Sequence, residues 1–235
     1  MWLSNRAMAE LAKPGQFLSI YSSDKSRLLP RPISICEIDR ERDAVRVVFR
    51  VVGAGTDEFS HLDPEDTIEA IGPLGNGYKL TESGIALLVG GGIGIPPLLE
   101  LAKELKCEKN IVLGYRDADC FLANEFRRYG NVMIATEDGS VGTKGFVTDC
   151  IRQNDIAASE LFACGPMPML KGVAALAAEA GIPAQVSLEE RMACGIGACL
   201  GCVAKTKTKD EHTNVNNKRI CVEGPVFRAD EIEWK

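Results

Sequence analysis

Four of the nine cysteines are spaced like the ligands of a metal centre. The segment CGIGACLGC contains Cys194, Cys199 and Cys202, and Cys221 follows after 18 further residues. The pattern C-x4-C-x2-C with a distant fourth cysteine is typical of the ligands of a plant-type [2Fe–2S] cluster. A zinc site is the alternative, but structural zinc sites usually combine two closely spaced pairs, and only one is present here. A segment that binds neither group is the third possibility.

Glycines separate these cysteines at Gly195, Gly197 and Gly201. A loop that wraps around a cluster must bring many backbone N–H groups towards sulfur. Glycine permits the positive φ and the close approach that this requires. Such N–H contacts also tune the reduction potential of a cluster. The glycines therefore favour the [2Fe–2S] interpretation.

A second glycine-rich segment, VGGGIGIPPLLE, follows an apolar run and precedes a helical pattern. Glycines let a phosphate approach the backbone, and a helix N-terminus offers it N–H donors. The strict fingerprint G-x-G-x-x-G is not met, because Pro97 stands where the last glycine would be. A tight turn with glycines for packing is the alternative. The segment predicts a nucleotide site at Gly90, Gly91, Gly92 and Gly94.

Two further segments could contact this nucleotide. Arg116 and Asp117 follow the next apolar run. An acid there favours a free ribose 2′-hydroxyl and an arginine favours a 2′-phosphate, so the pair only leans towards NAD over NADP. The segment FACGPMPML ends a strand and begins a helix, which would place Cys164 at the crevice where α/β sheets bind ligands. A buried thiol at a strand end is the alternative for Cys164.

Three kinds of segment position these residues. Residues 14–81 hold short β-branched or alternating runs, which predicts a small barrel or sandwich. Residues 82–188 alternate apolar runs with helical patterns, which predicts a parallel sheet. From about residue 189 the chain is rich in glycine and cysteine and then polar. Strands are expected in GQFLSIYS, RPISICEID, AVRVVFRVV, DTIEAIGPLG, GIALLVGG, KNIVLGYRD, NVMIATED, ELFACG and PAQVSLE, and helices in PPLLELAKELK, CFLANEFRRYG and PMPMLKGVAALAAEAG.

Composition excludes several functions. The 235 residues carry a net charge of −6 without a long basic block, which gives nucleic acid no electrostatic footprint. The longest nearly apolar run has 15 residues, whereas a membrane span needs about 20. The start does not resemble a signal peptide, so we expect a cytoplasmic protein. The cysteines outside the motifs are expected to be small buried apolar residues: Cys36, Cys107, Cys120 and Cys150.

Five motifs in order resemble one known family. They are RPIS (31–34), GPLGNGY (72–78), GGGIGIPP (90–97), CGPMPML (164–170) and the cysteine segment. Together they resemble the electron-transfer subunit of NAD-dependent type B dihydroorotate dehydrogenase, within the ferredoxin reductase-like superfamily. The first and last motifs together are specific, and the middle ones are shared across the superfamily. The resemblance covers essentially the whole chain.

The resemblance implies a fold and its cofactors. Residues 1–81 would form a small FAD-binding β-barrel, residues 82–188 a parallel-sheet NAD-binding α/β domain, and residues 189–235 the [2Fe–2S] module. The arginine of RPIS would bind the flavin pyrophosphate and the serine would lie near the reactive edge of the flavin. Without the resemblance, Arg31 would be an ordinary strand-edge arginine. The implied FAD residues are Arg31, Pro32, Ile33, Ser34, Val48, Phe49, Arg50, Gly55 and Thr56. The implied nicotinamide side adds Cys164, Gly165 and Pro166, and Ser34 and Cys164 are the catalytic candidates.

The resemblance also implies a function and a partner. The partner subunit would carry FMN and oxidise dihydroorotate in pyrimidine biosynthesis, and two of each subunit would form a heterotetramer. This chain would pass the electrons through [2Fe–2S] and FAD to NAD⁺. It offers little for proton abstraction, because His61 and His212 both lie in polar surroundings. One alternative is the small subunit of a flavin-based NADPH–ferredoxin or sulfide-type oxidoreductase, and another is a zinc-bearing regulatory or interaction subunit.

The chain departs from the family pattern in two places. The family carries a full strand before KPGQF, whereas this chain begins at MWLSNRAMAEL. We expect either a shortened start or a barrel that closes differently, with an open edge. The 18 residues before Cys221 are more than the family pattern has, and their polar content predicts an exposed loop. The ligand role of Cys221 would be unchanged.

Overall fold

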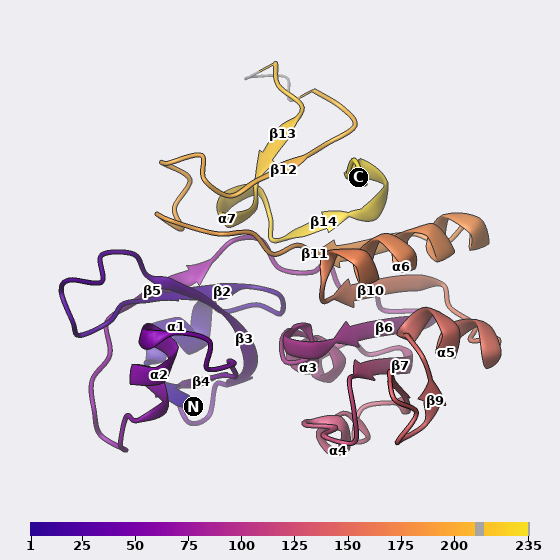
Figure 1. The fold of residues 1–235 in the computed structure, drawn as a ribbon, viewed down its shortest axis with the longest axis horizontal. Helices are drawn as coiled ribbons and strands as arrows, with labels where there is room; N and C mark the ends of the chain where they lie inside the picture. The colour runs from indigo at the N-terminus through magenta and orange to yellow at the C-terminus, as the bar shows by residue number, and fades with distance from the viewer. Residues whose placement is uncertain (210–213, 235) are drawn as a thin grey trace.

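The computed structural model of the chain describes residues 1–209 and 214–234. Two sheets lie side by side, and a small C-terminal module lies across the top of both (Figure 1). The first sheet is antiparallel, with strand order β1-β4-β3-β2-β5 and β1 and β5 at its edges. Its elements are β1 (Trp2–Ser4), α1 (Arg6–Leu11), β2 (Phe17–Ile20), β3 (Arg31–Asp39), β4 (Ala44–Val47), α2 (Ala54–Ser60) and β5 (Ala70–Leu74).

The first sheet curls around its own core. Leu18 and Ile20 of β2 and Ile35 and Ile38 of β3 are buried there, and Phe59 of α2 joins them. β-branched and aromatic side chains suit such a pleated, half-buried surface. The expected small N-terminal β-domain is confirmed as a curled antiparallel half-barrel, and β1 is a three-residue strand paired with β4.

The second sheet has the order β14-β11-β10-β6-β7-β8-β9 and is parallel except for the antiparallel strand β14. Its chain runs through β6 (Ile85–Gly91), α3 (Pro97–Glu104), β7 (Glu108–Tyr115), α4 (Ala123–Phe126), β8 (Asn131–Thr136), β9 (Thr143–Lys144), α5 (Val147–Gln153), β10 (Glu160–Cys164), α6 (Met167–Ala180) and β11 (Ala184–Ser187). Helices α3 and α4 cover one face, and α5 and α6 cover the other (Figure 1).

The apolar run of β6 explains this two-sided cover. Ala86 and Leu88 pack in the core with α3, while Leu87 and Val89 pack in the core with α5 and α6. A strand buried on both faces reads as a continuous apolar run, as IALLVGG does. The predicted parallel sheet is therefore confirmed. No helix within the described residues has the length and apolar character that crossing a membrane requires.

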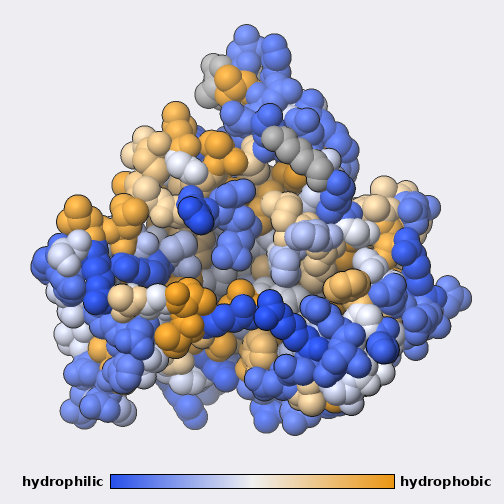
Figure 2. All heavy atoms as spheres, in the orientation of Figure 1, coloured by the Kyte–Doolittle hydropathy of each residue, from blue (hydrophilic) through white to orange (hydrophobic). Residues whose placement is uncertain are grey.

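The C-terminal module contains β12 (Val203–Lys205), β13 (Asn217–Arg219), α7 (Ile220–Glu223), β14 (Val226–Arg228) and the short 3-10 turn η2 (Ala229–Glu231). Strands β12 and β13 form an antiparallel hairpin. The expected exposed loop before Cys221 is thus partly a hairpin at the top of the molecule, and its residues 210–213 lie outside the described residues (Figures 1 and 2).

Local structure differs from the sequence prediction in two shortened elements and in several short helices. The run AVRVVFRVV is a strand only over Ala44–Val47. CFLANEFRRYG is helical only over Ala123–Phe126, because Leu122 has a left-handed φ of 63° and interrupts the helix. Helices α1, α2, α5 and α7 were not expected, since each has at most seven residues and too few turns for a clear helical period.

Candidate functional site

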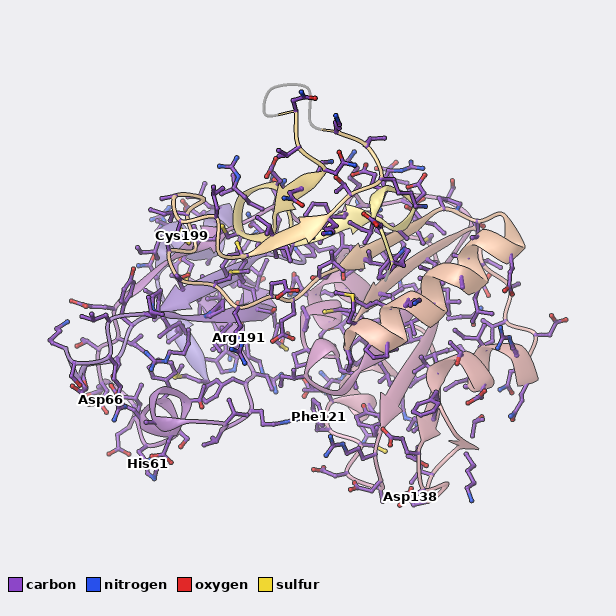
Figure 3. The ribbon with its side chains drawn as sticks, turned by 45° about the horizontal axis from the view of Figure 1, so that its top comes forward. His61, Asp66, Phe121, Asp138, Arg191 and Cys199 are labelled. Atoms are coloured by element: carbon purple, nitrogen blue, oxygen red, sulfur yellow. The ribbon has the colours of Figure 1, made fainter. Side chains whose placement is uncertain are left out.

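The four cysteines of the C-x4-C-x2-C…C pattern come together as two neighbouring pairs. The thiols of Cys194 and Cys199 interact with each other, and the thiol of Cys221 interacts with those of Cys202 and Cys194. Cys202 and Cys221 are buried, whereas Cys199 lies exposed on the outer side of the loop (Figure 3). The long-range pairing of Cys221 with the loop is the part that spacing alone could not supply.

Backbone N–H groups surround these sulfurs as the glycine pattern suggested. The Ala198 N–H donates to Cys194 Sγ at 3.2 Å, and the Gly201 N–H donates to Cys199 Sγ at 3.4 Å. Further N–H groups, led by that of Ile196, lower the pKa of Cys194 to about 6. Burial and the neighbouring Cys202 thiol raise the pKa of Cys221 to about 12. A bound metal centre would offset that rise, because a coordinating thiol is deprotonated outright.

The loop geometry explains two of its glycines. Gly195 and Gly197 have φ values of 69° and 84°. A Cβ at Gly195 would lie 2.5 Å from Ser19 Oγ, and one at Gly197 would lie 2.5 Å from a methyl group of Val222. Any side chain there would push the loop away from β2 or from α7.

The two neighbouring pairs of thiols suit a [2Fe–2S] cluster. Within residues 1–209 and 214–234, no three Cys, His, Asp or Glu side chains are grouped as ligands of a single metal ion. A [2Fe–2S] cluster requires four cysteines shared between two irons, and two adjacent pairs of thiols match that need.

The motif GPLGNGY holds the cysteine module against the first sheet. The Asn76 N–H donates to the Gly224 carbonyl at 2.5 Å, and its side-chain amide donates to the carbonyls of Val222 and Glu223 at 3.3 and 3.0 Å. These bonds fix the turn that follows Cys221. In the sequence, this motif contributed only to the family resemblance, and the positioning role of Asn76 was not predicted.

The predicted FAD residues lie on β3, on the segment after β4 and at the start of α2. The Arg31 guanidinium lies directly over Gly55, since a Cβ at Gly55 would collide with Arg31 Nε. Arg31 also donates to the Leu29 carbonyl at 2.6 Å. Thr56 Oγ1 accepts from the N–H groups of Val52 and Gly53 at 3.0 and 3.2 Å and shapes the turn before α2. The motifs RPIS and GT therefore meet in space.

The charges near this turn suit an anion. In the described part of the chain, neither Arg31 nor Arg50 forms an ion pair with a carboxylate. Guanidinium groups without a protein counter-ion match the oxygens of a phosphate. The other predicted FAD residues lie on the same two segments, with Pro32 exposed and Ile33, Ser34, Val48 and Phe49 half-buried.

The glycine turn and the CGP segment pack directly on each other. Gly90 and Gly91 end β6, and Gly92–Gly94 form a 3-10 turn before α3. A Cβ at Gly94 would collide with the carbonyl group of Cys164. A Cβ at Gly165 would lie 3.2 Å from the backbone nitrogen of Gly91. The structure therefore joins the two predicted halves of the nucleotide site at the carboxyl ends of β6 and β10.

Cys164 is a buried thiol at the end of β10, and its role at the nicotinamide stays a prediction. It is 9% exposed, and burial raises its pKa to about 12. Tyr78 packs beside it and donates its hydroxyl to the Ala163 carbonyl at 3.1 Å. At neutral pH the Cys164 side chain is a neutral thiol.

The remaining candidates are placed without forming a site. Arg116 and Asp117 are exposed after β7, so the choice between NAD and NADP stays a prediction from the sequence. His61 is exposed at the end of α2, far from the cysteine loop (Figure 3). His212 lies outside the described residues. Cys36 and Cys150 are buried as expected, whereas Cys107 and Cys120 are only half-buried.

Comparisons with known proteins agree with this geometry. Residues 189–233 match the family model of the iron–sulfur cluster binding domain of dihydroorotate dehydrogenase B. The electron transfer subunit of dihydroorotate dehydrogenase B (NAD(+)) from Fusobacterium nucleatum is 44% identical over 245 residues, covering 99% of this chain and 92% of the relative. The subunit of the same name from Listeria monocytogenes is 46% identical over 228 residues, covering 94% and 87%.

Solved structures show the same fold. A chain of the NADH-dependent reduced ferredoxin–NADP oxidoreductase, described for flavin-based electron bifurcation, is 34% identical with a TM-score of 0.88 and covers 99% of this chain and 84% of its own. A ferredoxin NADP+ reductase from Neisseria gonorrhoeae, solved with bound FAD and NADP, has a TM-score of 0.57 at 15% identity, covering 75% and 83%. The latter supports the ferredoxin reductase-like fold alone.

Proposed function

The chain belongs to the family of electron transfer subunits of dihydroorotate dehydrogenase B, and from that premise we propose how it carries electrons. It receives them from the FMN of a catalytic partner that oxidises dihydroorotate, and it delivers them through a [2Fe–2S] cluster and FAD to NAD⁺. The [2Fe–2S] cluster and FAD supply the redox chemistry when bound, and the chain supplies binding, orientation and electrostatics.

One observation carries this proposal: the three candidate sites touch one another in the required order. Gly195 of the cysteine loop lies against Ser19 of β2. Ser19 is paired across the sheet with Pro32 of the RPIS motif. On the other side, the Arg50 guanidinium reaches to within 3.9 Å of the Cβ position of Gly92 in the glycine turn. A cluster, a flavin and a nicotinamide held by these residues would be neighbours.

We assign the roles within the chain as follows. Cys194, Cys199, Cys202 and Cys221 hold the cluster as thiolates. Arg31, together with the turn at Gly55 and Thr56, holds the FAD pyrophosphate, while Ser34 hydrogen-bonds the flavin ring. The glycine turn and residues 164–166 hold NAD, with the neutral Cys164 thiol near the nicotinamide. These units correspond to residues 1–81 for FAD, 82–188 for NAD and 189–235 for the cluster.

The partner would dock over the cysteine loop. Ile196, Leu200 and Val222 are exposed around it, at 57%, 64% and 39%. Figure 2 shows hydrophobic side chains beside the polar hairpin, where this loop runs in Figure 1. Apolar side chains gathered on a surface mark interaction sites. We propose a heterotetramer with two copies of each subunit. None of the nine cysteines forms a disulfide, which supports a cytoplasmic location.

Replacing Arg31 with alanine is expected to weaken FAD retention by about one to two orders of magnitude. A charge-assisted hydrogen bond to phosphate contributes roughly 1.5–3 kcal/mol, which corresponds to that range of affinity. Flavin absorbance after dialysis measures the remaining occupancy. Arg42→Ala, which removes an arginine side chain that is 82% exposed, is the matched control. Unchanged FAD occupancy in Arg31→Ala would remove Arg31 from the site.

The cofactor content of the purified chain tests the proposed function. The protein should be brown-yellow, with about one FAD and about two irons per chain. Mixed with NADH and an artificial electron acceptor, it should reduce the acceptor without any partner. A colourless zinc protein, or a flavin that NADH does not reduce, would contradict the proposal.

A further inference from the structure

The predicted FAD and NAD sites lie at the starts of strand β3 and helix α3, which pack against each other. Strand β3 begins with the RPIS motif, and helix α3 begins just after the glycine turn. Cys36 on β3 is fully buried in the same core as Leu98 and Leu99 of α3. Any shift between β3 and α3 would therefore move one cofactor site relative to the other.

Two side chains of α3 bind both main-chain groups of a single β3 residue. Glu100 Oε2 accepts from the Ile38 N–H at 2.7 Å, and Lys103 Nζ donates to the Ile38 carbonyl at 2.7 Å. Lys103 Nζ also lies 3.3 Å from Glu100 Oε2. The two side chains are thus paired with each other and together hydrogen-bond both backbone groups of Ile38.

These side chains stand where a neighbouring strand would otherwise be. Strand β2 pairs with β3 only as far as Ser34, and β4 pairs along the opposite edge of β3. The backbone groups of Ile38 on the free edge need partners, because a buried unpaired group costs free energy. Glu100 and Lys103 supply those partners from the other sheet's domain.

Glu100 is an unusual residue for a merely structural contact. It is 0% exposed, and its Oε1 atom has no hydrogen-bond partner in the described structure. Burial raises its pKa above the ordinary value for glutamate. A buried, incompletely partnered carboxyl group destabilises a fold, whereas an apolar side chain of similar size often does not. By contrast, the ion pairs Arg40–Glu104 and Arg46–Glu125, which join the two domains, are partly exposed.

We propose that Glu100 is a positioning residue for hydride transfer between NAD(H) and FAD. It fixes β3 against α3, and so fixes the distance between the flavin and the nicotinamide. This inference rests on the proposed function. In that reaction NADH is oxidised to NAD⁺ as its hydride, carrying two electrons, passes to the flavin. The reacting atoms must lie about 3–3.5 Å apart, and a misplacement of about 1 Å can slow such a step about 100-fold.

Single-turnover flavin bleaching by saturating NADH, in the FAD- and cluster-loaded chain, tests the proposal. Glu100→Leu should slow bleaching about 10- to 100-fold while changing neither FAD content nor the apparent NADH affinity. Glu100→Gln keeps an acceptor for the Ile38 N–H and should restore the rate to within about 3-fold. Glu104→Gln, which alters an exposed contact of the same helix, is the matched control and should leave the rate unchanged.

Hydrogen exchange gives a readout that does not depend on activity. The amide of Ile38 should exchange faster in Glu100→Leu than in the unaltered chain, and Glu100→Gln should keep it protected. If Glu100→Leu does not fold, Lys103→Met is used instead, because it removes the hydrogen bond from Lys103 to the Ile38 carbonyl. That variant should slow bleaching by about 3- to 10-fold, a smaller loss because one of the two contacts remains.

Three results would overturn the proposal. The first is a folded Glu100→Leu variant, or Lys103→Met if Glu100→Leu does not fold, whose flavin is bleached at the rate of the unaltered chain. The second is an equal loss of bleaching rate in Glu100→Leu and Glu104→Gln. The third is a change in the apparent NADH affinity of Glu100→Leu without a change in its bleaching rate. If NADH does not bleach the flavin of the unaltered chain, the proposed function itself fails and this inference falls with it. Bleaching that is normal in the unaltered chain and in all variants refutes the inference alone.

Discussion

Cys202→Ser is expected to lose the [2Fe–2S] cluster while keeping FAD. Cys202 is buried, and its thiol adjoins that of Cys221. Iron–sulfur clusters select soft thiolate ligands, and a serine hydroxyl at this position would supply a hard oxygen in their place. Iron should fall from about two atoms per chain to almost none. Flavin content should stay near its original value, because the residues assigned to FAD lie on β3, after β4 and on α2.

Iron and acid-labile sulfide analysis, together with flavin absorbance, measures both expectations on one sample. Cys107→Ser is the matched control, since Cys107 is half-buried and lies outside the cysteine module. Its iron content should be unaltered. The Cys202 variant should still pass electrons from NADH to an artificial acceptor, but not from the dihydroorotate-oxidising partner to NAD⁺. Iron and sulfide at the unaltered level in Cys202→Ser would exclude Cys202 as a ligand.

Gly94→Ala, which adds one methyl group, is expected to disrupt the predicted NAD site strongly. The added methyl group would collide with the backbone of Cys164 and Gly165, which cannot move like a flexible side chain. Overpacking of this kind destabilises a protein by about 1–3 kcal/mol. The forced separation of the two turns should also slow flavin reduction by NADH about 100-fold, because geometry in the reacting pair is lost.

Thermal unfolding and single-turnover bleaching measure these two effects. Gly172→Ala is the control, because it adds the same methyl group inside α6, where the nearest atom is a methyl group of Thr148 at 3.3 Å. Alanine is favoured over glycine inside a helix by roughly 0.5–1 kcal/mol, so that variant should be at least as stable as the original chain. Equal behaviour of the two variants would show that the contact between the turns is unimportant.

Local patterns in the sequence predicted most of the fold because they report local physics. The alternation of apolar runs and helical patterns over residues 82–188 predicted the parallel sheet. The cysteine spacing predicted a ligand set whose first three members lie in one loop. The short helices α1, α2, α5 and α7 were missed, since at most seven residues carry too little periodicity to indicate a helix.

Contacts between distant parts of the chain could not be predicted in this way. The side-chain bond that Asn76 donates to Glu223 and the bond that Ile38 donates to Glu100 join residues that are 147 and 62 positions apart. Each bond joins a side chain to a backbone group. Because every residue type except proline has the same backbone groups, the sequence does not indicate which residue is the partner. The addition of β14 to the second sheet could not be predicted either, because a run of three residues, VFR, is too short to indicate a strand.

The central claim is that this chain conducts electrons from a flavin-bearing partner to NAD⁺ and does not oxidise dihydroorotate itself. The most direct test follows NADH formation from dihydroorotate and NAD⁺ without oxygen, using the chain loaded with FAD and cluster. No NADH should form until the FMN-containing catalytic subunit is added, and its addition should start the reaction at once. NADH formation by the chain alone, in a preparation shown to be free of FMN protein, would contradict the account, as would a complete mixture that forms none.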